Sequence, residues 1–195
     1  MKIEEEYGLP EIYFSKVTAA NYEKSRAMRK IQTEITRRAL EFIKSTEGTA
    51  LDIGCGTGFS MQVLADAGFD AVGVDVSQDM IDIAVSKGFK ALHGTFMNLP
   101  FDNNSFDAAV SISALQWIQA KSESELIRNY LKVLTEIYRV LKPKGECVIQ
   151  FYPINATYHD LFIKAVKKTP FTARTVTDFP NNQKKRKTFI VLEKR

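Results

Sequence analysis

The chain has 195 residues, 45% of them apolar, which fits one folded domain with a sizeable core. No stretch approaches the roughly 18 uninterrupted apolar residues that cross a bilayer, and the N-terminus lacks the layout of a signal peptide, so we expect a cytoplasmic protein. The net charge of +4 divides into +1 for residues 1–48, −6 for 49–120 and +9 for 121–195, so the last part suits a polyanionic partner or forms a solvated surface.

Residues 1–48 are predicted to form a helical cap on a core at residues 49–195, within a single domain of residues 1–195. Apolar side chains recur in the cap at spacings of three and four residues, as on one face of a helix. Five residues make this pattern: Met28, Ile31, Ile35, Ala39 and Phe42. We expect the helix to cover the sheet or a ligand cleft.

From Thr49 onward, short apolar runs alternate with helical patterns, which is typical of a parallel sheet with crossover helices. The clearest helix runs from about Glu123 to Leu141, with a capping box at Ser122 and Glu125. Pro143 and Gly145 are expected to end it. The predicted strands are 49–54, 71–75, 91–96, 106–112, 145–152, 172–177 and 187–193.

The first predicted strand leads into a glycine-rich turn with glycines at positions 54, 56 and 58. Glycine permits positive φ and lets a ligand approach the backbone closely. The dinucleotide fingerprint G-x-G-x-x-G needs a glycine at position 59, which is Phe59, so the spacing disfavours NAD. Asp52 stands two positions before the first glycine. The turn therefore predicts a nucleoside site of another kind.

The second and third strands end in residues that suit a nucleoside. Asp75 ends the second strand, where a carboxylate accepts hydrogen bonds from both ribose hydroxyls. Ser77 then caps a helix that contains Met80. Val76 and Met80 are expected to form a wall beside an adenine ring. Thr95 and Phe96 follow Gly94 at the end of the third strand.

These segments, in this order over residues 49–150, resemble class I S-adenosylmethionine-dependent methyltransferases. The resemblance implies an α/β, Rossmann-like seven-stranded sheet of order 3-2-1-4-5-7-6 with the last strand antiparallel and helices on both faces. It implies that Asp75 holds the ribose, that Asp52 orients the amino acid portion of the cofactor, and that residues near Thr95 and Phe96 read the adenine. The implied cofactor residues are Asp52, Gly54, Cys55, Gly56, Gly58, Asp75, Val76, Met80, Thr95, Phe96 and Ser111.

Several acceptor classes are disfavoured by what the sequence lacks. The two histidines, His93 and His159, form no metal-like cluster, so we expect no metal site. Residues 111–117, SISALQW, lack the Asn/Asp-Pro-Pro-aromatic signature of amino-group methylation. Cys147 in a predicted buried strand and Cys55 in the turn are poorly placed as nucleophiles for carbon methylation. Guanine N7, a carboxylate and a thiol remain, and the basic last part favours guanine.

Several segments are similar to the eukaryotic 18S rRNA guanine-N7 methyltransferase family: 21–26 with 31–34, 111–117, 150–153, and 178–181 followed by 184–187. This resemblance implies an RNA substrate and a small zinc-binding activator protein that docks beside the cofactor domain. Trp117, Phe151 and Tyr152 lie at the carboxyl ends of strands, where ligands bind, and are candidates to stack on the acceptor base. The phosphate-contact candidates are Arg26, Lys184, Lys185, Arg186 and Lys187.

Two other functions remain open at this stage. Carboxyl methyltransferases of small molecules carry a similar Gln-Trp pair at the position of Gln116 and Trp117, so a small-molecule acceptor is an alternative. A ribosome-assembly factor that keeps the fold and binds the cofactor without transferring the methyl group is another. A closed apolar pocket with no basic approach would favour the first alternative.

Overall fold

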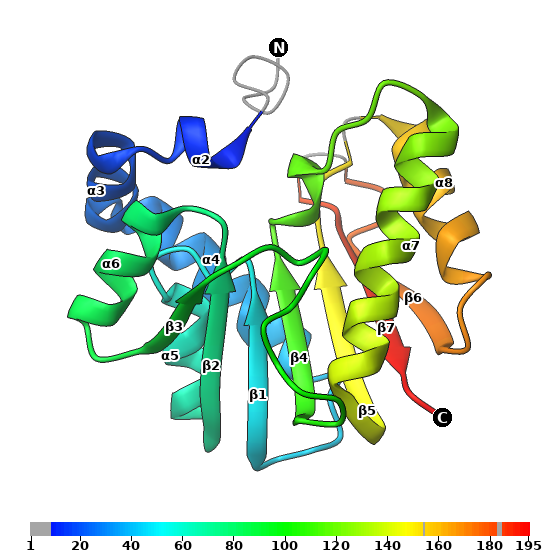
Figure 1. Ribbon diagram of the computed structural model, residues 1–195, viewed down its shortest axis with the longest axis horizontal. Coiled ribbons are helices and arrows are strands. Elements are labelled where there is room, and N and C mark those ends of the chain that lie inside the picture. Colours follow the sequence, from blue (N-terminus) through cyan, green and yellow to red (C-terminus); the bar gives the residue numbers. More distant parts are fainter. Residues whose placement is uncertain (1–8, 154, 183–184) are drawn as a thin grey trace.

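A seven-stranded sheet of order β3-β2-β1-β4-β5-β7-β6 forms the centre of the computed structural model, which describes residues 9–153, 155–182 and 185–195 (Figure 1). β7 runs antiparallel to β5 and β6, and the other neighbouring pairs are parallel. The strand order and the antiparallel last strand are confirmed. The strands are β1 (Gly48–Ile53), β2 (Phe69–Asp75), β3 (Lys90–His93), β4 (Phe106–Ile112), β5 (Leu141–Gln150), β6 (Thr172–Asp178) and β7 (Lys187–Glu193).

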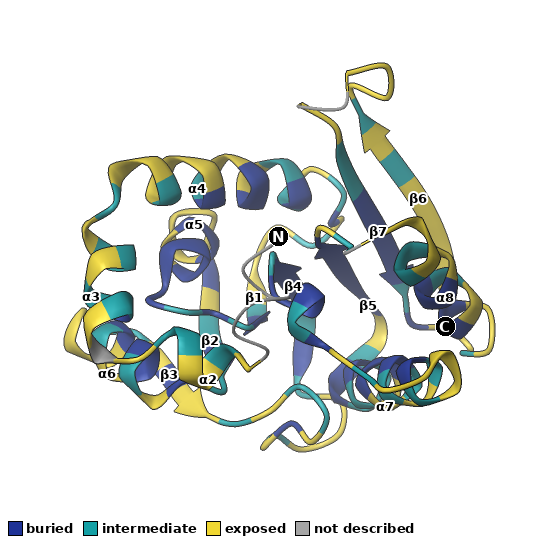
Figure 2. Ribbon diagram, turned by 90° about the horizontal axis from the view of Figure 1, so that it is seen from above, coloured by how far each residue is buried: buried dark blue, intermediate teal, exposed yellow. Residues whose placement is uncertain are grey.

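Helices cover both faces of the sheet, as Figure 2 shows from above. α4 (Arg26–Leu40) and α5 (Phe59–Asp66) lie on one face, and α7 (Glu123–Val140) and α8 (Ala156–Val166) lie on the other. The central strands are therefore buried on both sides, which explains why their sequences are continuous apolar runs rather than alternating ones. No helix of the described residues is long and apolar enough to cross a membrane.

In residues 9–48, the part of the N-terminal cap that the structure describes, there are three helices rather than the single predicted one: α2 (Pro10–Tyr13), α3 (Lys16–Lys24) and α4. Ser25 separates α3 from α4, because its hydroxyl accepts a hydrogen bond from the Met28 backbone N–H at 3.2 Å and caps α4. α2 and α3 lie above the carboxyl ends of the strands on the β3 side of the sheet (Figure 1).

Two predicted boundaries are wrong. Pro143 and Gly145 do not end α7, since the chain passes from Val140 directly into β5 and both residues lie in that strand. Lys144 adopts a φ of 67°, and the β4–β5 register shifts between Phe106 and Ala108, so this part of β5 is irregular. The third strand ends at His93 rather than at residue 96.

The predicted helix caps are present. The Ser122 hydroxyl accepts a hydrogen bond from the Glu125 backbone N–H at 3.2 Å, while the Glu125 carboxylate accepts one from the Lys121 backbone N–H at 2.8 Å. Ser77 caps α6 (Gln78–Ser86) by accepting a hydrogen bond from the Met80 backbone N–H at 3.3 Å. The cap at Ser77 fixes the start of α6 immediately after Asp75.

The far end of α4 is joined to the β6–β7 hairpin by a forked ion pair. The Arg38 guanidinium donates two hydrogen bonds to the Asp178 carboxylate, at 2.8 and 2.9 Å. The same guanidinium lies 4.5 Å from the centre of the Phe42 ring. This contact connects residues 140 positions apart in the chain and fixes the N-terminal cap against the last two strands.

Candidate functional site

The turn between β1 and α5 exposes backbone at the carboxyl edge of the sheet. Gly54, Gly56 and Gly58 have φ values of 80°, 52° and 88°, in the left-handed region that favours glycine. A Cβ on Gly56 would meet no atom within 4 Å, so the space above this residue is open to a ligand. A Cβ on Gly54 would lie 2.4 Å from the Ala114 Cβ, so this glycine is needed for packing.

Asp75, at the end of β2, is held beside that turn. One carboxylate oxygen accepts a hydrogen bond from the Gly56 backbone N–H at 2.8 Å, and the other accepts one from the Ser77 backbone N–H at 2.9 Å. Burial raises the pKa of this carboxyl group, and the backbone hydrogen bonds oppose that rise. Each oxygen keeps further lone pairs, so the oriented carboxylate can accept hydrogen bonds from two ligand hydroxyls.

Asp52, in β1, is completely buried. One of its oxygens accepts a hydrogen bond from the Ser60 hydroxyl, and the other has no partner within the structure. Burial raises the Asp52 pKa to about 7, and the hydrogen bond from Ser60 opposes the rise. An unpaired buried acceptor is costly, so this oxygen is suited to a hydrogen-bond donor supplied by a ligand.

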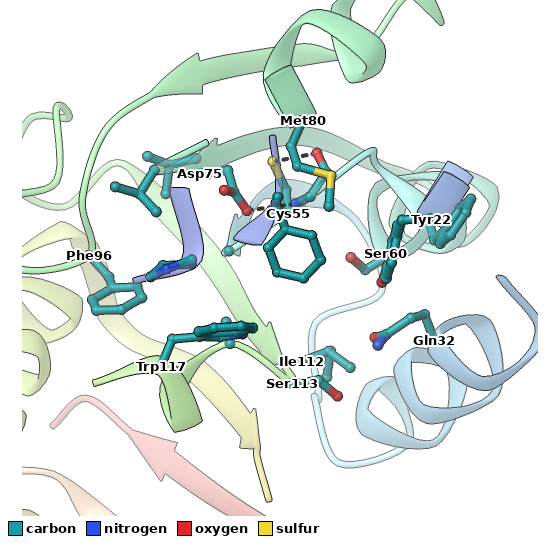
Figure 3. A pocket seen from close by; sticks show the side chains of 18 of the residues that line it. Tyr22, Gln32, Cys55, Ser60, Asp75, Met80, Phe96, Ile112, Ser113 and Trp117 are labelled. Atoms are coloured by element: carbon teal, nitrogen blue, oxygen red, sulfur yellow. Dashed lines mark hydrogen bonds between the residues drawn. The ribbon is translucent and has the colours of Figure 1, made fainter. Parts of the chain in front are cut away.

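An inner cavity of about 70 Å³ lies at this edge of the sheet and brings several predicted residues together. In Figure 3, Phe96 and Trp117 lie at one end of it and Tyr22 and Gln32 at the other, with Asp75 between them. Ser60, which binds Asp52, is also in its wall. The predicted residues that line the inner cavity are Gly54, Cys55, Gly56, Asp75, Val76, Met80, Phe96 and Trp117.

Four of the predicted cofactor residues do not line the inner cavity. Asp52 is one of them and adjoins the cavity only through Ser60, to which it is hydrogen-bonded. The others are Thr95, Ser111 and Gly58. The Thr95 hydroxyl accepts a hydrogen bond from the Met97 backbone N–H at 3.3 Å and closes a turn. Ser111 is completely buried, and its hydroxyl donates a hydrogen bond to the Ile53 carbonyl at 2.9 Å between two strands. Gly58 caps α5 in the left-handed conformation beside Phe89. These three residues shape the strands and turns behind the cavity.

The N-terminal cap supplies cavity residues that the sequence pattern did not single out. Tyr22 from α3 stacks on Phe59 with ring centres 5.4 Å apart, and burial raises the pKa of its phenol. Gln32 lies on the apolar face of α4, four residues from Met28, and only 8% of it is exposed. A polar residue on an apolar helix face was the signal that could have identified it.

An outer cavity of about 380 Å³ lies next to the inner one and shares five wall residues with it: Phe14, Tyr22, Gln32, Ser113 and Trp117. Aromatic rings from the N-terminal cap pack on the Trp117 indole, with Tyr13 at 5.6 Å and Phe14 at 5.4 Å between ring centres. The outer cavity is therefore an aromatic space that adjoins the inner cavity along one wall.

The two other predicted stacking residues lie elsewhere. Phe151 is 3% exposed and packs on Phe162 in the core, with ring centres 5.2 Å apart, so its ring faces are occupied. Tyr152 is 36% exposed, and the Lys187 ammonium lies 5.5 Å from its ring centre. Tyr152 therefore belongs to the surface beside the β6–β7 hairpin, and Trp117 is the predicted aromatic residue that lines the cavities.

The predicted basic contacts form two groups. Arg26 is exposed at the first residue of α4, directly after Ser25, which lines the outer cavity. Lys185 and Arg186 are exposed in the β6–β7 hairpin, which Arg38 joins to the other end of α4. Arg26 and Arg38 are 12 residues apart on one helix, about 18 Å along its axis. Lys184 lies outside the described residues.

Neither cysteine has the properties of a nucleophile. Burial raises the pKa of the Cys147 thiol and raises that of Cys55 well above its ordinary value, so both are held as thiols. Among the described residues, no group of three or more His, Cys, Asp or Glu side chains could hold a metal ion.

The sequence is similar to a known family and to named relatives. Residues 51–149 match the methyltransferase domain family. The probable 18S rRNA (guanine-N(7))-methyltransferase of Dictyostelium discoideum is 35% identical over 94% of this chain and 67% of its own length. The 18S rRNA (guanine-N(7))-methyltransferase of Bos taurus is 36% identical over 95% of this chain and 69% of its own length.

Solved structures show the same fold. A putative S-adenosyl-L-methionine-dependent methyltransferase from Methanococcus maripaludis superposes with a TM-score of 0.68 at 19% identity, over 93% of this chain and 94% of its own. A chain from the complex between the Haloferax volcanii Trm112 methyltransferase activator and the putative methyltransferase gives a TM-score of 0.69 at 20% identity, over 91% of this chain and 96% of its own.

Proposed function

Because the chain belongs to the family of 18S rRNA (guanine-N7)-methyltransferases, we propose that it transfers a methyl group from S-adenosylmethionine to N7 of a guanine in ribosomal RNA. The observation that carries this proposal is the pair of adjoining cavities at the carboxyl edge of the sheet. The inner one has the groups that a nucleoside with an amino acid side chain requires, and the outer one can receive a planar base beside it.

The residues of the inner cavity fit the cofactor. Asp75 would accept hydrogen bonds from the two ribose hydroxyls, because the Gly56 and Ser77 backbone N–H groups already orient its carboxylate. Asp52 does not line the inner cavity, so it would act on the amino acid portion of the cofactor through Ser60, whose hydroxyl lines the cavity and donates a hydrogen bond to the Asp52 carboxylate. The open space above Gly56 admits the ligand to the backbone.

The adenine ring would lie between apolar side chains. Val76 and Met80 wall the inner cavity on the α6 side, and Phe96 walls it from the turn after β3. Ligand pockets of this type usually hold several hundred Å³, and the inner cavity encloses only about 70 Å³, so we expect it to widen when the cofactor binds. Phe14 from the N-terminal cap lines this cavity, and we expect that segment to move.

The cofactor, when bound, supplies an electrophilic methyl group. Guanine N7 carries a lone pair and no proton, so the new N7–methyl bond forms without the loss of a proton and leaves the positive charge on the base. The chain therefore needs to supply no general base, and placement of the base in line can supply about 7 to 11 kcal/mol. Trp117 is suited to this placement, because it lines both cavities and a base can stack on it.

Methylation of ribosomal RNA can be tested directly. The protein would be incubated with tritiated S-adenosylmethionine and small ribosomal subunits from cells that lack the guanine-N7 activity, and the label would be mapped. We expect label at N7 of a guanine in the small-subunit RNA. Label in small metabolites and never in RNA would instead favour the carboxyl methyltransferase alternative, and cofactor binding without transfer to any ribosomal substrate would favour the assembly factor.

The basic hairpin is proposed to contact RNA phosphates together with Arg26. Replacement of Lys185, Arg186 and Lys187 by Ala should reduce the slope of RNA affinity against salt by about one unit per lost phosphate contact. The matched control replaces three exposed lysines after and at the end of α8: Lys164, Lys167 and Lys168. Equal slopes for the two triple variants and the original protein would contradict a phosphate-binding hairpin.

A small activator protein is proposed to dock at the β3 edge. Within the described ranges, β3 pairs with β2 alone, so its outer side is an edge on which another chain can add a strand. Leu92 in β3 is 46% exposed and Val85 in the adjacent α6 is 51% exposed. Co-expression with a small activator protein from the organism that encodes this chain should raise the melting temperature of the chain. Leu92→Lys should abolish that rise. An unchanged rise would place the partner elsewhere.

A further inference from the structure

We propose that the side chain of Gln116 selects guanine in the outer cavity by accepting hydrogen bonds from the N–H groups at positions N1 and N2 of the base. This inference rests on the proposed function, since it takes the outer cavity as the acceptor site. Gln116 lies in the short helix η1 (Leu115–Trp117) that follows β4. It is distinct from Trp117, which contacts the faces of a base and not its edge.

The first observation is an unpaired buried acceptor. Gln116 is 7% exposed, and its side-chain oxygen Oε1 has no hydrogen-bond partner within the structure. The same residue lines the outer cavity. A buried acceptor without a donor is unfavourable and rare in folded proteins, so a ligand that brings N–H donors into the outer cavity would satisfy it.

The second observation is where Gln116 lies relative to the shared wall. Gln116 lines the outer cavity and not the inner one, whereas Ser113, Tyr22 and Trp117 line both. If N7 of a guanine points at the inner cavity, the opposite edge of the base, with N1 and N2, points away from the shared wall. That edge then faces the outer cavity, and Gln116 is one of the residues that line the outer cavity alone.

The third observation is that the backbone on both sides of Gln116 is held by hydrogen bonds. Ser113 has a φ of 56°, which is unusual for a residue other than glycine. Its backbone N–H donates to the Gln150 carbonyl at 2.7 Å, and its hydroxyl donates to the Gln150 side-chain oxygen at 3.1 Å. The Trp117 backbone N–H donates to the Ala114 carbonyl at 3.1 Å. The start of η1 is therefore preorganised rather than free to adapt to any base.

The chemistry of the bases makes this acceptor selective. Guanine presents N–H donors at N1 and N2, whereas adenine presents an acceptor at N1 and a C–H group at position 2. An oxygen acceptor at that edge therefore pairs with guanine and stays unpaired with adenine. A site that loses such a hydrogen bond discriminates against the wrong base by about tenfold to a hundredfold.

Trp117 is the only tryptophan of the chain and lines both cavities, so its fluorescence reports on a base that stacks there. The first test titrates the protein, loaded with S-adenosylhomocysteine, with guanosine 5′-monophosphate or adenosine 5′-monophosphate and follows the quenching of Trp117. The original protein should bind the guanosine nucleotide about tenfold more tightly or better. Equal quenching curves for the two nucleotides would overturn the role of Gln116.

Substitutions of Gln116 then separate the effect of its hydrogen-bond acceptor from the effect of the shape of its side chain. Gln116→Leu removes the acceptor but keeps a side chain of similar size. It should abolish the preference for guanosine by lowering the affinity for the guanosine nucleotide alone. Gln116→Glu keeps an acceptor and should keep the preference. Gln62→Leu, at an exposed residue of α5, is the matched control and should change the affinity for neither nucleotide. Loss of the preference in both Gln116 variants, or in neither, would contradict the proposal.

Methylation of under-modified small ribosomal subunits distinguishes this inference from the proposed function. If the original protein labels the RNA, Gln116→Leu should lower kcat/KM about tenfold to a hundredfold, while calorimetry shows unchanged S-adenosylhomocysteine affinity. Labelling at an unchanged kcat/KM would overturn the role of Gln116 and leave the proposed function standing. If the original protein labels no RNA but the fluorescence titration still shows tighter binding of the guanosine nucleotide, the proposed function fails and the guanine site remains.

Discussion

At the scale of single residues, Asp75 is the side chain whose removal should affect cofactor binding most directly. Asp75→Asn keeps one acceptor for the neighbouring backbone N–H groups but loses the charge that strengthens bonds to the ribose. We expect S-adenosylhomocysteine affinity to fall by about tenfold to a hundredfold, which corresponds to about 1.5 to 3 kcal/mol. Calorimetry measures this change. Asp82→Asn, on the exposed side of α6, should leave the affinity unaltered.

Asp52 should make cofactor binding depend on pH. Burial raises its pKa to about 7, so the carboxyl group is partly protonated near neutral pH. A bound ammonium group favours the charged carboxylate, so the pKa falls on binding and a proton is released. S-adenosylhomocysteine affinity should therefore rise as the pH increases from 6 to 8, and the heat of binding should vary with the ionisation enthalpy of the buffer. The same pH profile in Asp52→Asn would show that another group is responsible.

Sequence reasoning identified the residues of the site that stand at fixed positions relative to strands. Gly56 lies in the turn after the first predicted strand and Asp75 ends the second, so their place at the edge of the sheet could be inferred from the sequence. Tyr22 and Gln32 could not be placed in this way, because their approach to the cavity depends on how the N-terminal cap folds back over the sheet. For Thr95, the sequence did not indicate that its hydroxyl accepts a hydrogen bond from the Met97 backbone N–H in the turn after β3.

At the scale of elements, the turn between β1 and α5 can be tested with a pair of glycines. Gly56 and Gly88 both have positive φ, and a Cβ on either would meet no atom within 4 Å. Gly56→Ala and Gly88→Ala should therefore destabilise the fold by similar amounts, about 1 to 2 kcal/mol, in urea unfolding. Only Gly56→Ala places a methyl group in the cofactor space and should weaken S-adenosylhomocysteine binding. Equal binding by both variants would show that this space is not used.

The boundaries of elements were harder to infer than the elements themselves. Pro143 and Gly145 usually end a helix, but here Leu141 leaves the helical conformation first and the two residues are accommodated in an irregular part of β5. The break at Ser25 was missed because the apolar spacing continues through α4 alone and carries no information on α3. At the end of α7, Leu141 pairs with Phe106 of β4, so a contact between distant residues decides the local structure. The break at Ser25 is instead made by a local cap.

At the scale of the whole molecule, the Arg38–Asp178 pair joins the N-terminal cap to the last two strands. A double-mutant cycle with Arg38→Ala and Asp178→Ala should give a coupling free energy of about 0.5 to 1 kcal/mol, since both side chains are partly exposed. The exposed pair of Lys90 and Asp70 is the control and should show almost no coupling. A coupling no larger than that of the control would mean that the forked geometry adds nothing to stability.

The same pair should respond to acid. The Arg38 guanidinium lowers the Asp178 pKa below its ordinary value, so the native state holds this proton less tightly than the unfolded chain. The stabilisation is therefore present above the unfolded pKa of about 3.9 and is lost as the pH falls through the lower native value. Repetition of the cycle at pH 7 and in strong acid should show the coupling free energy decrease. A constant coupling would point to packing instead of charge.

The global architecture was predictable because it depends on order rather than on exact boundaries. Alternating apolar runs and helical patterns predict a parallel sheet, and the resemblance supplied the strand order that the structure confirms. The outer cavity could not be predicted, since it forms only where α2, α3 and α4 meet the segment after β4. A site that forms between distant segments can be located only when the tertiary structure is known.

The position of β7 between β5 and β6 has a consequence for how the chain is made on the ribosome. Residues 151–193 must be synthesised before β5 gains its second neighbour, which takes on the order of seconds at about 5 to 20 residues per second. During that interval the nascent chain exposes the open side of β5. Until β7 has been translated and inserted, a nascent chain is therefore vulnerable to pairing with other chains, and a chaperone that shields β5 would increase the yield of folded protein.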